Sequence, residues 1–206
     1  LYRTYPNLLT YEGVLGMEQG ARCKPENSNW LPFIRNAVGP MDFTPGSMFS
    51  AQPEDNRSTG ANPMGTGTRA YQMALYVVFE SPLQMLADNP VLYRREHPCT
   101  EFLAAVPTTW DSLRVLHAAC GREVVVARRK GDKWYVGGIT NDRPYTTEIA
   151  LDFLPAGRTF TMTSFEDGVN ADLQATDYRK RVREVDASTV VKVEMVRNGG
   201  WAAVIE

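Results

Sequence analysis

The pattern of apolar and polar positions changes near the middle of the chain. Residues 1 to about 106 alternate short apolar runs with longer stretches of helical periodicity, which is typical of βα units. Beyond them, apolar residues recur at every second position and tight turns separate the runs, which predicts antiparallel strands. The segment Pro107 to Asp111 lies between the two patterns and is the expected linker. We therefore predict an α/β part over 1–107 and an antiparallel β domain over 108–206.

The first half is predicted to hold three strand–loop–helix repeats. The expected strands cover 8–10, 41–43 and 83–87, and the expected helices cover 30–38, 68–79 and 91–106. Pro32 is tolerated in the first turn of its helix, Thr68 offers a hydroxyl to the start of the second, and Pro98 breaks or kinks the third. Residues 44–67 form a long polar loop, which is typical of a functional or mobile segment. Three such repeats suit the last part of a barrel.

The helix at 68–79 and the strands of the second half have the strongest patterns. Met73, Tyr76 and Val77 place one apolar stripe on that helix. The expected strands lie at 123–129, 134–140, 146–153, 159–165, 190–196 and 201–205. A Lys-Gly-Asp-Lys turn at 130–133 joins the first two as a hairpin.

Acidic residues follow all three expected strands of the first half, at Glu12, Asp42 and Asp88. Active sites of (β/α)8 barrels lie at the carboxyl ends of the strands. Glu12 and Glu18 are separated by two glycines, which favour a loop over a helix. Two carboxylates in one cavity serve glycoside hydrolysis, and they also suit a hard cation such as Ca²⁺. The alternative is a pair of solvated loop glutamates.

Other side chains have two interpretations each. Asp42 either contacts a substrate hydroxyl or begins an Asx-type turn, and Trp30 either stacks on a sugar ring or packs. We interpret Asp88 as structural. Arg35 and Arg69 are candidates for pinning acids in the barrel, although a structural pairing is the more common role of each. The two histidines, His97 and His117, have no ligand partners nearby in the sequence and are assigned core or surface roles.

Bulk properties exclude some classes of function. The chain has 206 residues, a net charge of −2 and a pI near 5.8, so it has no basic field for nucleic acid or anionic lipid. No apolar run approaches the roughly 20 residues that span a bilayer. Three cysteines without metal-type spacing are expected to be buried thiols. The start at Leu1, without an initiator Met, resembles a fragment boundary.

Five motifs, in their order and spacing, resemble those of glycoside hydrolase family 97, a family of α-glucosidases and α-galactosidases. They are YPNLLT at 5–10, YEGV at 11–14, GPMDFTPG at 39–46, SPLQMLADNP at 81–90 and WYVGGITN at 134–141. The resemblance covers nearly the whole chain, but it matches only the C-terminal part of such an enzyme. It implies the last part of a (β/α)8 barrel followed by a C-terminal antiparallel β-sandwich.

The resemblance also implies roles for the two glutamates. Glu18 matches the catalytic acid, and Glu12 matches a calcium ligand, with Glu18 touching the ion only peripherally. Two glutamates are too few for the 6–8 oxygen ligands of Ca²⁺, so the other ligands are expected from a missing N-terminal part. The same is expected of the partner carboxylate, which leaves inversion or retention open. The implied substrate is an oligosaccharide with a terminal α-linked glucose or galactose, and the implied location is periplasmic or secreted.

Two alternatives belong to other classes. One is a non-catalytic carbohydrate-binding or structural module, which exposed Trp134, Tyr135 or Trp201 would favour, although core packing is the more common role for such aromatics. The other is an unrelated barrel enzyme, such as an aldolase or a metal-dependent hydrolase. It ranks low, because no Lys lies at a strand end and no histidine cluster is present.

Overall fold

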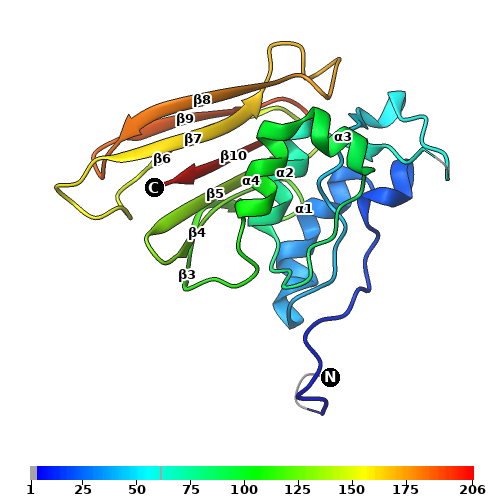
Figure 1. Ribbon diagram of the computed structural model, residues 1–206, viewed down its shortest axis with the longest axis horizontal. Coiled ribbons are helices and arrows are strands. Elements are labelled where there is room, and N and C mark those ends of the chain that lie inside the picture. Colours follow the sequence, from blue (N-terminus) through cyan, green and yellow to red (C-terminus); the bar gives the residue numbers. More distant parts are fainter. Residues whose placement is uncertain (1–3, 61) are drawn as a thin grey trace.

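A six-stranded antiparallel sheet forms the largest element of the protein. The structure is a computed structural model that describes residues 4–60 and 62–206, so Leu1 to Arg3 and Ala61 lie outside the described residues. The strand order is β3-β4-β5-β10-β7-β8 (Figure 1). The strands are β3 (Ser112–Ala119), β4 (Glu123–Lys130), β5 (Lys133–Thr140), β7 (Phe160–Asp167), β8 (Tyr178–Val185) and β10 (Gly200–Ile205).

A smaller sheet packs on one face of the large sheet and makes the second half a β-sandwich. It consists of β6 (Tyr145–Ala150) and β9 (Val190–Met195), which pair antiparallel. Side chains from both sheets form one apolar core, in which Trp201 is 1% exposed and Ile149, Met162 and Val193 are also buried. The antiparallel β prediction for the second half is therefore confirmed.

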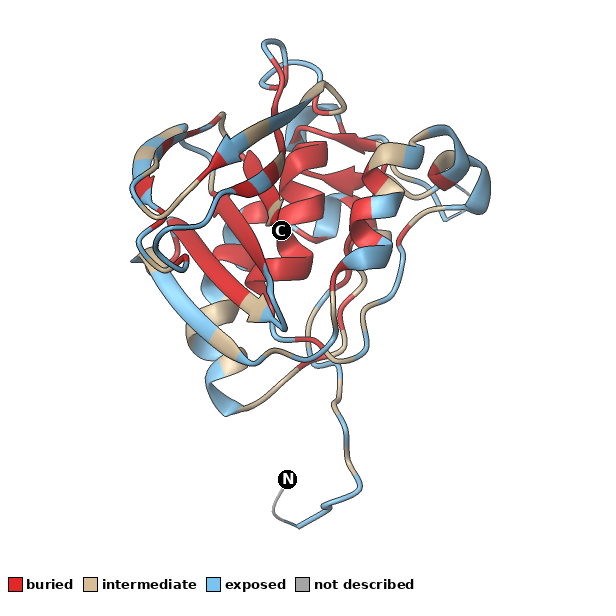
Figure 2. Ribbon diagram, turned by 60° about the vertical axis from the view of Figure 1, so that its left-hand side comes forward, coloured by how far each residue is buried: buried red, intermediate tan, exposed pale blue. Residues whose placement is uncertain are grey.

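Helix α2 (Arg69–Val78) covers the opposite face of the large sheet (Figures 1 and 2). It begins as predicted, with the Thr68 hydroxyl accepting a hydrogen bond from the Tyr71 amide at 3.0 Å. The residues of the predicted stripe, Met73, Tyr76 and Val77, are buried, and so is every other residue of α2. The sheet lies on one side of this helix, and first-half residues such as Met17 and Phe43 belong to the same core on its other sides.

Two glycines let α2 approach the sheet closely. A Cβ at Gly137 of β5 would lie 2.8 Å from Val77 Cβ and 2.9 Å from the Ala74 carbonyl. A Cβ at Gly200 of β10 would collide with the backbone of Tyr71. The absence of side chains at Gly137 and Gly200 therefore sets how closely α2 packs against the sheet.

We expect Gly200→Ala to lower the free energy of unfolding by about 1–3 kcal/mol, because a rigid helix backbone cannot yield to the added methyl group. Urea unfolding followed by circular dichroism would measure the change. The matched control is Gly60→Ala, where nothing lies within 4 Å of the added Cβ and a change within about 0.5 kcal/mol is expected. Equal stability of both variants would contradict the close approach.

The helices of the first half differ from the predicted ones mainly at their starts. Helix α1 (Pro25–Ile34) begins earlier than predicted, so Pro32 lies inside it rather than in its first turn, and the short 3-10 helix η2 (Asn36–Val38) follows. The break near Pro98 is confirmed, since the stretch divides into α3 (Pro90–Arg95) and α4 (His97–Ala105).

The three strands predicted for the first half are not formed as strands. Single parallel bridges join Tyr11 to Met41 and Phe43 to Gln84. The stretch 44–67 is also not simply a polar loop. It contains the short strands β1 (Ser50–Ala51) and β2 (Gly65–Thr66), which pair in parallel, and the 3-10 helix η3 (Pro53–Asp55), and much of it is buried.

The predicted linker, 107–111, falls in the connection between α4 and β3. Core packing nevertheless crosses this connection, because the ring centroids of Phe102 in α4 and Tyr135 in β5 are 6.5 Å apart and α2 lies against β5 and β10. The boundary near residue 108 stays a prediction.

Candidate functional site

Residues 11–16 form neither a helix nor a strand, with a bend at Val14, and the 3-10 helix η1 (Met17–Arg22) follows them. The guanidinium group of Arg35 fixes the start of this segment by donating hydrogen bonds of 2.7–3.2 Å to the carbonyls of Tyr11 and Glu12. The same group binds the carbonyls of Gly39 and Pro40. Arg35 therefore ties two loops together through their backbones, which agrees with the structural alternative.

Glu18 lies in the first turn of η1, and its carboxylate folds back over Gly16. Any Cβ at Gly16 would collide with Glu18 Oε2, so this conformation requires a glycine there. Oε2 is buried and has no hydrogen-bond partner among the described residues, whereas Oε1 accepts a weak bond from Gln19 at 3.4 Å. Burial, and next the charge of Glu18, raise the pKa of the Cys23 thiol to about 12. The carboxylate is thus partly desolvated and has one oxygen free to bind.

The side chain of Glu12 is exposed, and no described hydrogen bond or ion pair joins it to Glu18. Two further buried oxygens without partners, Thr10 Oγ1 and Asp42 Oδ1, lie beside the Tyr11–Met41 bridge. Among the described residues, no group of three or more His, Cys, Asp or Glu side chains could hold a metal ion. These acids therefore offer oxygen ligands without completing a site.

Asp88 is structural, in agreement with its interpretation from sequence. Its Oδ2 accepts hydrogen bonds from the Met48 and Phe49 amides at 2.5 and 2.8 Å and from the Ser47 hydroxyl at 3.2 Å. The neighbouring Asn89 caps α3 by accepting bonds from the first amides of that helix. Together these contacts hold the buried 47–49 loop in place.

Trp30 is half-exposed and packs over Gly121, where a Cβ would lie 2.6 Å from the indole ring. It lines a pocket of about 310 Å³ together with Leu15, Cys23 and Ile34. This lining contains neither Glu12 nor Glu18. The structure thus gives Trp30 a packing role, and the role in sugar binding stays a prediction.

The aromatic residues of the β-sandwich are in the core. Trp134, Tyr135 and Trp201 are 6%, 4% and 1% exposed, so none offers a face to a sugar. The two histidines pair with acids on the surface or rim: His97 lies 3.5 Å from Glu101 and His117 lies 3.1 Å from Glu123. Arg69, the other candidate for pinning an acid, forms a 2.9 Å ion pair with Glu96. All three cysteines are free; Cys23 and Cys99 are buried as expected, whereas Cys120 is exposed, so the expectation of a buried thiol is wrong there.

Sequence analysis missed Asp167, the most perturbed acid that the structure describes. It lies at the end of β7 and accepts hydrogen bonds from the Thr68 hydroxyl at 2.6 Å and from the Val196 and Gly200 amides at 3.0 and 3.1 Å. Burial raises the pKa of its carboxyl to about 7 against these donors. In the sequence it resembles an ordinary turn acid before Gly168, so no local signal identifies it.

Known proteins match the first half of the chain as well as the second. Residues 109–206 match the family model described as "Glycosyl-hydrolase 97 C-terminal, oligomerisation". The retaining alpha-galactosidase of Bacteroides thetaiotaomicron is 43% identical over an alignment that covers 100% of this chain and 32% of that protein. A probable retaining alpha-galactosidase of Streptomyces bingchenggensis is 32% identical over 99% of this chain and 29% of that protein.

Among solved structures, a glycoside hydrolase family 97 enzyme from Pseudoalteromonas sp. strain K8, in complex with acarbose, superimposes with a TM-score of 0.86 at 35% identity. The match covers 100% of this chain and 33% of that one. The chain thus spans about a third of the length of the relatives that it matches. In sequence and in structure, it belongs to glycoside hydrolase family 97 and corresponds to a C-terminal part of its members.

Proposed function

We propose that this chain contributes the general acid of a retaining, exo-acting α-glycosidase that removes terminal α-linked galactose from oligosaccharides. The observation that carries the proposal is the 43% identity over the whole chain to a retaining alpha-galactosidase. Galactoside is favoured over glucoside because both curated relatives are named as alpha-galactosidases. The whole activity requires the N-terminal part that the relatives have in addition.

Glu18 acts as the acid in this proposal. It protonates the departing glycosidic oxygen and then, as a base, takes a proton from the water that releases the sugar. Its buried Oε2 has no competing partner among the described residues, so it is free to face the scissile bond. The nucleophilic carboxylate of a retaining enzyme lies about 5–5.5 Å from the acid and is supplied by the preceding part of the enzyme.

Calcium belongs to the proposal, since carboxylate oxygens are the ligands that this ion prefers. The exposed carboxylate of Glu12 would be this chain's main ligand, with Glu18 at the periphery. When bound, the ion supplies positive charge that orients substrate hydroxyls. Thr10 Oγ1 and Asp42 Oδ1, buried without described partners, are further oxygens beside this segment, and Asp42 is the candidate for a substrate hydroxyl. The set remains short of 6–8 ligands.

The first half completes a (β/α)8 barrel in this proposal. The parallel bridges Tyr11–Met41 and Phe43–Gln84 support the expected strand order. Exposed apolar side chains on this half would be covered by the preceding repeats; they include Leu9, Ile34, Val38, Leu83 and Leu86. The β-sandwich mediates contacts between copies, as the description of its family model says of such domains. No described helix is long and apolar enough to cross a membrane, and we propose a periplasmic or secreted location from the family resemblance.

Hydrolysis by the complete enzyme tests the proposal. We expect p-nitrophenyl α-galactoside to be cleaved faster than the α-glucoside, with retention of configuration in the first-formed sugar by NMR. Chelation should abolish turnover and added calcium should restore it. The 206-residue chain alone should be inactive and should bind calcium no tighter than about 1 mM by calorimetry, given its few ligands. Tight calcium binding by the chain alone would contradict an incomplete site.

The non-catalytic carbohydrate-binding module is not favoured. It depended on exposed Trp134, Tyr135 or Trp201, and all three are buried.

A further inference from the structure

One face of β8 points toward the sandwich core, and Val185 lies on it. The small sheet does not cover the rest of this face. Register places Arg179, Arg181 and Arg183 opposite Glu166, Ser164 and Met162 of β7, on the same face as the sandwich core. Strand β9 packs against β7 and β10, and the three arginines are 36–47% exposed along their side chains. A two-stranded sheet is too narrow to cover six strands, so this strip stays in contact with solvent.

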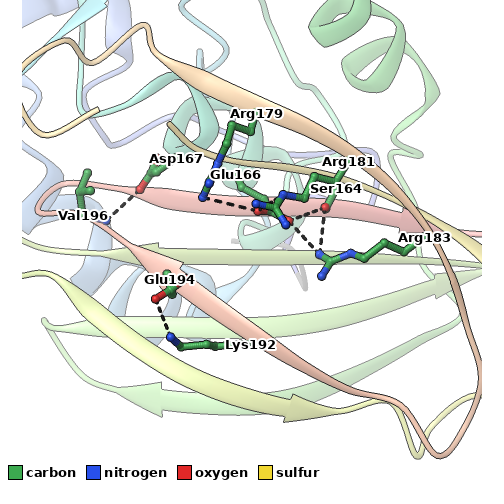
Figure 3. Close-up of polar contacts among 9 residues, drawn as sticks. All are labelled: Ser164, Glu166, Asp167, Arg179, Arg181, Arg183, Lys192, Glu194 and Val196. Atoms are coloured by element: carbon green, nitrogen blue, oxygen red, sulfur yellow. Dashed lines mark hydrogen bonds and ion pairs between the residues drawn. The ribbon is translucent and has the colours of Figure 1, made fainter. Parts of the chain in front are cut away.

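These cations are only partly neutralised. All three arginines converge on the buried carboxylate of Glu166, at 3.9, 3.3 and 2.8 Å (Figure 3). One carboxylate cannot satisfy three guanidinium groups, each of which has five N–H donors. Ser164 takes a further hydrogen bond from Arg183 at 3.3 Å. Donors on the exposed sides of Arg179 and Arg181 are therefore available to an added anion.

Strand β9 contributes one further cation, Lys192, and forms the other side of the surface. Lys192 forms a 2.7 Å ion pair with Glu194, and the charges of Lys192, Arg179 and Arg181 all lower the pKa of Glu194. The surface thus has four cations against three carboxylates, since Glu148 of β6 lies opposite Lys192, within a chain whose net charge is −2. At one end, between β8 and β9, lies a pocket of about 320 Å³ of mixed charge, whose lining includes Arg179, Arg197, Asp167, Asp172 and Glu194.

We propose that this β8–β9 surface binds a linear glycan that carries repeated carboxylate or sulfate groups. Arginines at every second position of a strand span about 13 Å, which suits a chain with repeated anionic groups better than one small anion. Guanidinium groups bind carboxylate and sulfate oxygens through paired, charge-assisted hydrogen bonds. Three arginines lie on this face within residues 179–183, a density of cations that suits polyanionic sugars, whereas Lys180 lies on the opposite face of β8 over the ring of Phe165.

Two other occupants fit the surface less well. A second copy that pairs through its own β8 edge would place like charges opposite one another, which opposes such pairing. A nucleic acid would need a longer basic surface, because duplex-binding proteins typically contact 6–10 phosphates. The surface is also independent of the proposed galactosidase site, since it contains no residue of the 10–18 segment.

Binding assays on the 206-residue chain test this inference. Calorimetry with dextran sulfate and with polygalacturonate distinguishes sulfate from carboxylate as the anionic group, and neutral dextran is the uncharged probe. We expect binding to at least one anionic chain, weakening as salt is added, and none to neutral dextran. No binding to either anionic chain at low ionic strength would overturn the proposal.

The variant Arg179→Gln/Arg181→Gln should weaken that binding at least about tenfold, because two charge-assisted contacts are lost. The matched control, Arg114→Gln/Arg122→Gln, removes the same charge from exposed residues near the other edge of the sheet and should leave binding unchanged. Equal weakening in both variants would reduce the effect to net charge and refute a site. Should the first variant unfold, Lys192→Gln on β9 provides the same test. Salt-sensitive self-association without glycan binding would identify a second copy as the occupant instead.

Discussion

Replacing Glu18 by Gln in the complete enzyme is expected to lower kcat for an α-galactosyl disaccharide by about 10²–10⁴-fold, the contribution of a positioned general acid. The amide has the shape of the carboxylic acid but cannot donate the proton that a sugar leaving group requires. The loss should be smaller for p-nitrophenyl α-galactoside, since nitrophenolate departs without protonation. Steady-state kinetics on the two substrates measure this difference.

Two additional measurements separate an acid from a residue that only binds calcium. Azide needs no general base to attack the glycosyl-enzyme, so it should restore turnover of the nitrophenyl substrate by Glu18→Gln. If Glu18 only bound calcium, the variant would instead lose turnover of both substrates equally, and excess calcium would restore it. The matched control is Glu26→Gln, an exposed acid in the first turn of α1, which should leave kcat unchanged.

Gly16→Ala should reproduce part of the same loss without touching the acid. The added methyl group collides only with the mobile end of Glu18, so stability should hold while the carboxylate moves. A displacement near 1 Å at a catalytic group reduces turnover by as much as about 10²-fold. Wild-type kinetics in this variant would show that the folded-back conformation of Glu18 is not the active one.

Asp167→Ala is expected to lower the free energy of unfolding by about 3 kcal/mol or more, because three buried donors lose their shared acceptor. These donors come from the N-cap residue of α2, Thr68, and from Val196 and Gly200 near the β9–β10 turn. Asp167→Asn should cost less, about 1–2 kcal/mol, since its oxygen can still accept the two amides while its amide group faces the Thr68 hydroxyl. Urea unfolding of both variants measures these losses.

The pH dependence has a defined sign. Burial raises the pKa of folded Asp167 from 3.8 to about 7, so between these values the native state binds more protons than the unfolded state. Its contribution to stability is therefore full below pH 3.8 and is lost as pH rises through 7. The melting temperature of wild type relative to Asp167→Asn should fall from pH 5 to pH 8. Asp132→Asn, in an exposed turn, should show no such slope, and a slope of opposite sign would mean that Asp167 is ionised throughout.

Local sequence patterns predicted the elements that are determined by neighbouring residues alone. Strands β4 and β5 and the start of α2 were predicted correctly, since alternation and the Thr68 cap are properties of neighbouring residues. Strand β8 was missed because it lies at the edge of the sheet with an uncovered inner face, so arginines occupy positions that alternation reserves for apolar residues. Strand β3 was missed because a bulge between Val115 and His117 shifts its pattern.

The first half and the candidate site depend on contacts between segments far apart in the sequence, which a local pattern cannot predict. Tyr11 and Phe43 form only single parallel bridges with their partners, and such pairing depends on neighbouring strands that no local pattern contains. Family motifs singled out Glu12 and Glu18, but only coordinates show that one is exposed and the other folded over Gly16. Asp167 needed three segments far apart in sequence to come together before it became unusual.

The complete burial of α2 has a consequence for how such domains are exchanged and engineered. The family model begins at residue 109, yet the sheet depends on a helix that precedes this point by about forty positions. A cut at 109 would leave Val124, Val126 and Ile139 facing water, inviting aggregation. Recombination between homologues should therefore succeed only when its crossover precedes Thr68. The unit that can be exchanged is then longer than the sandwich itself.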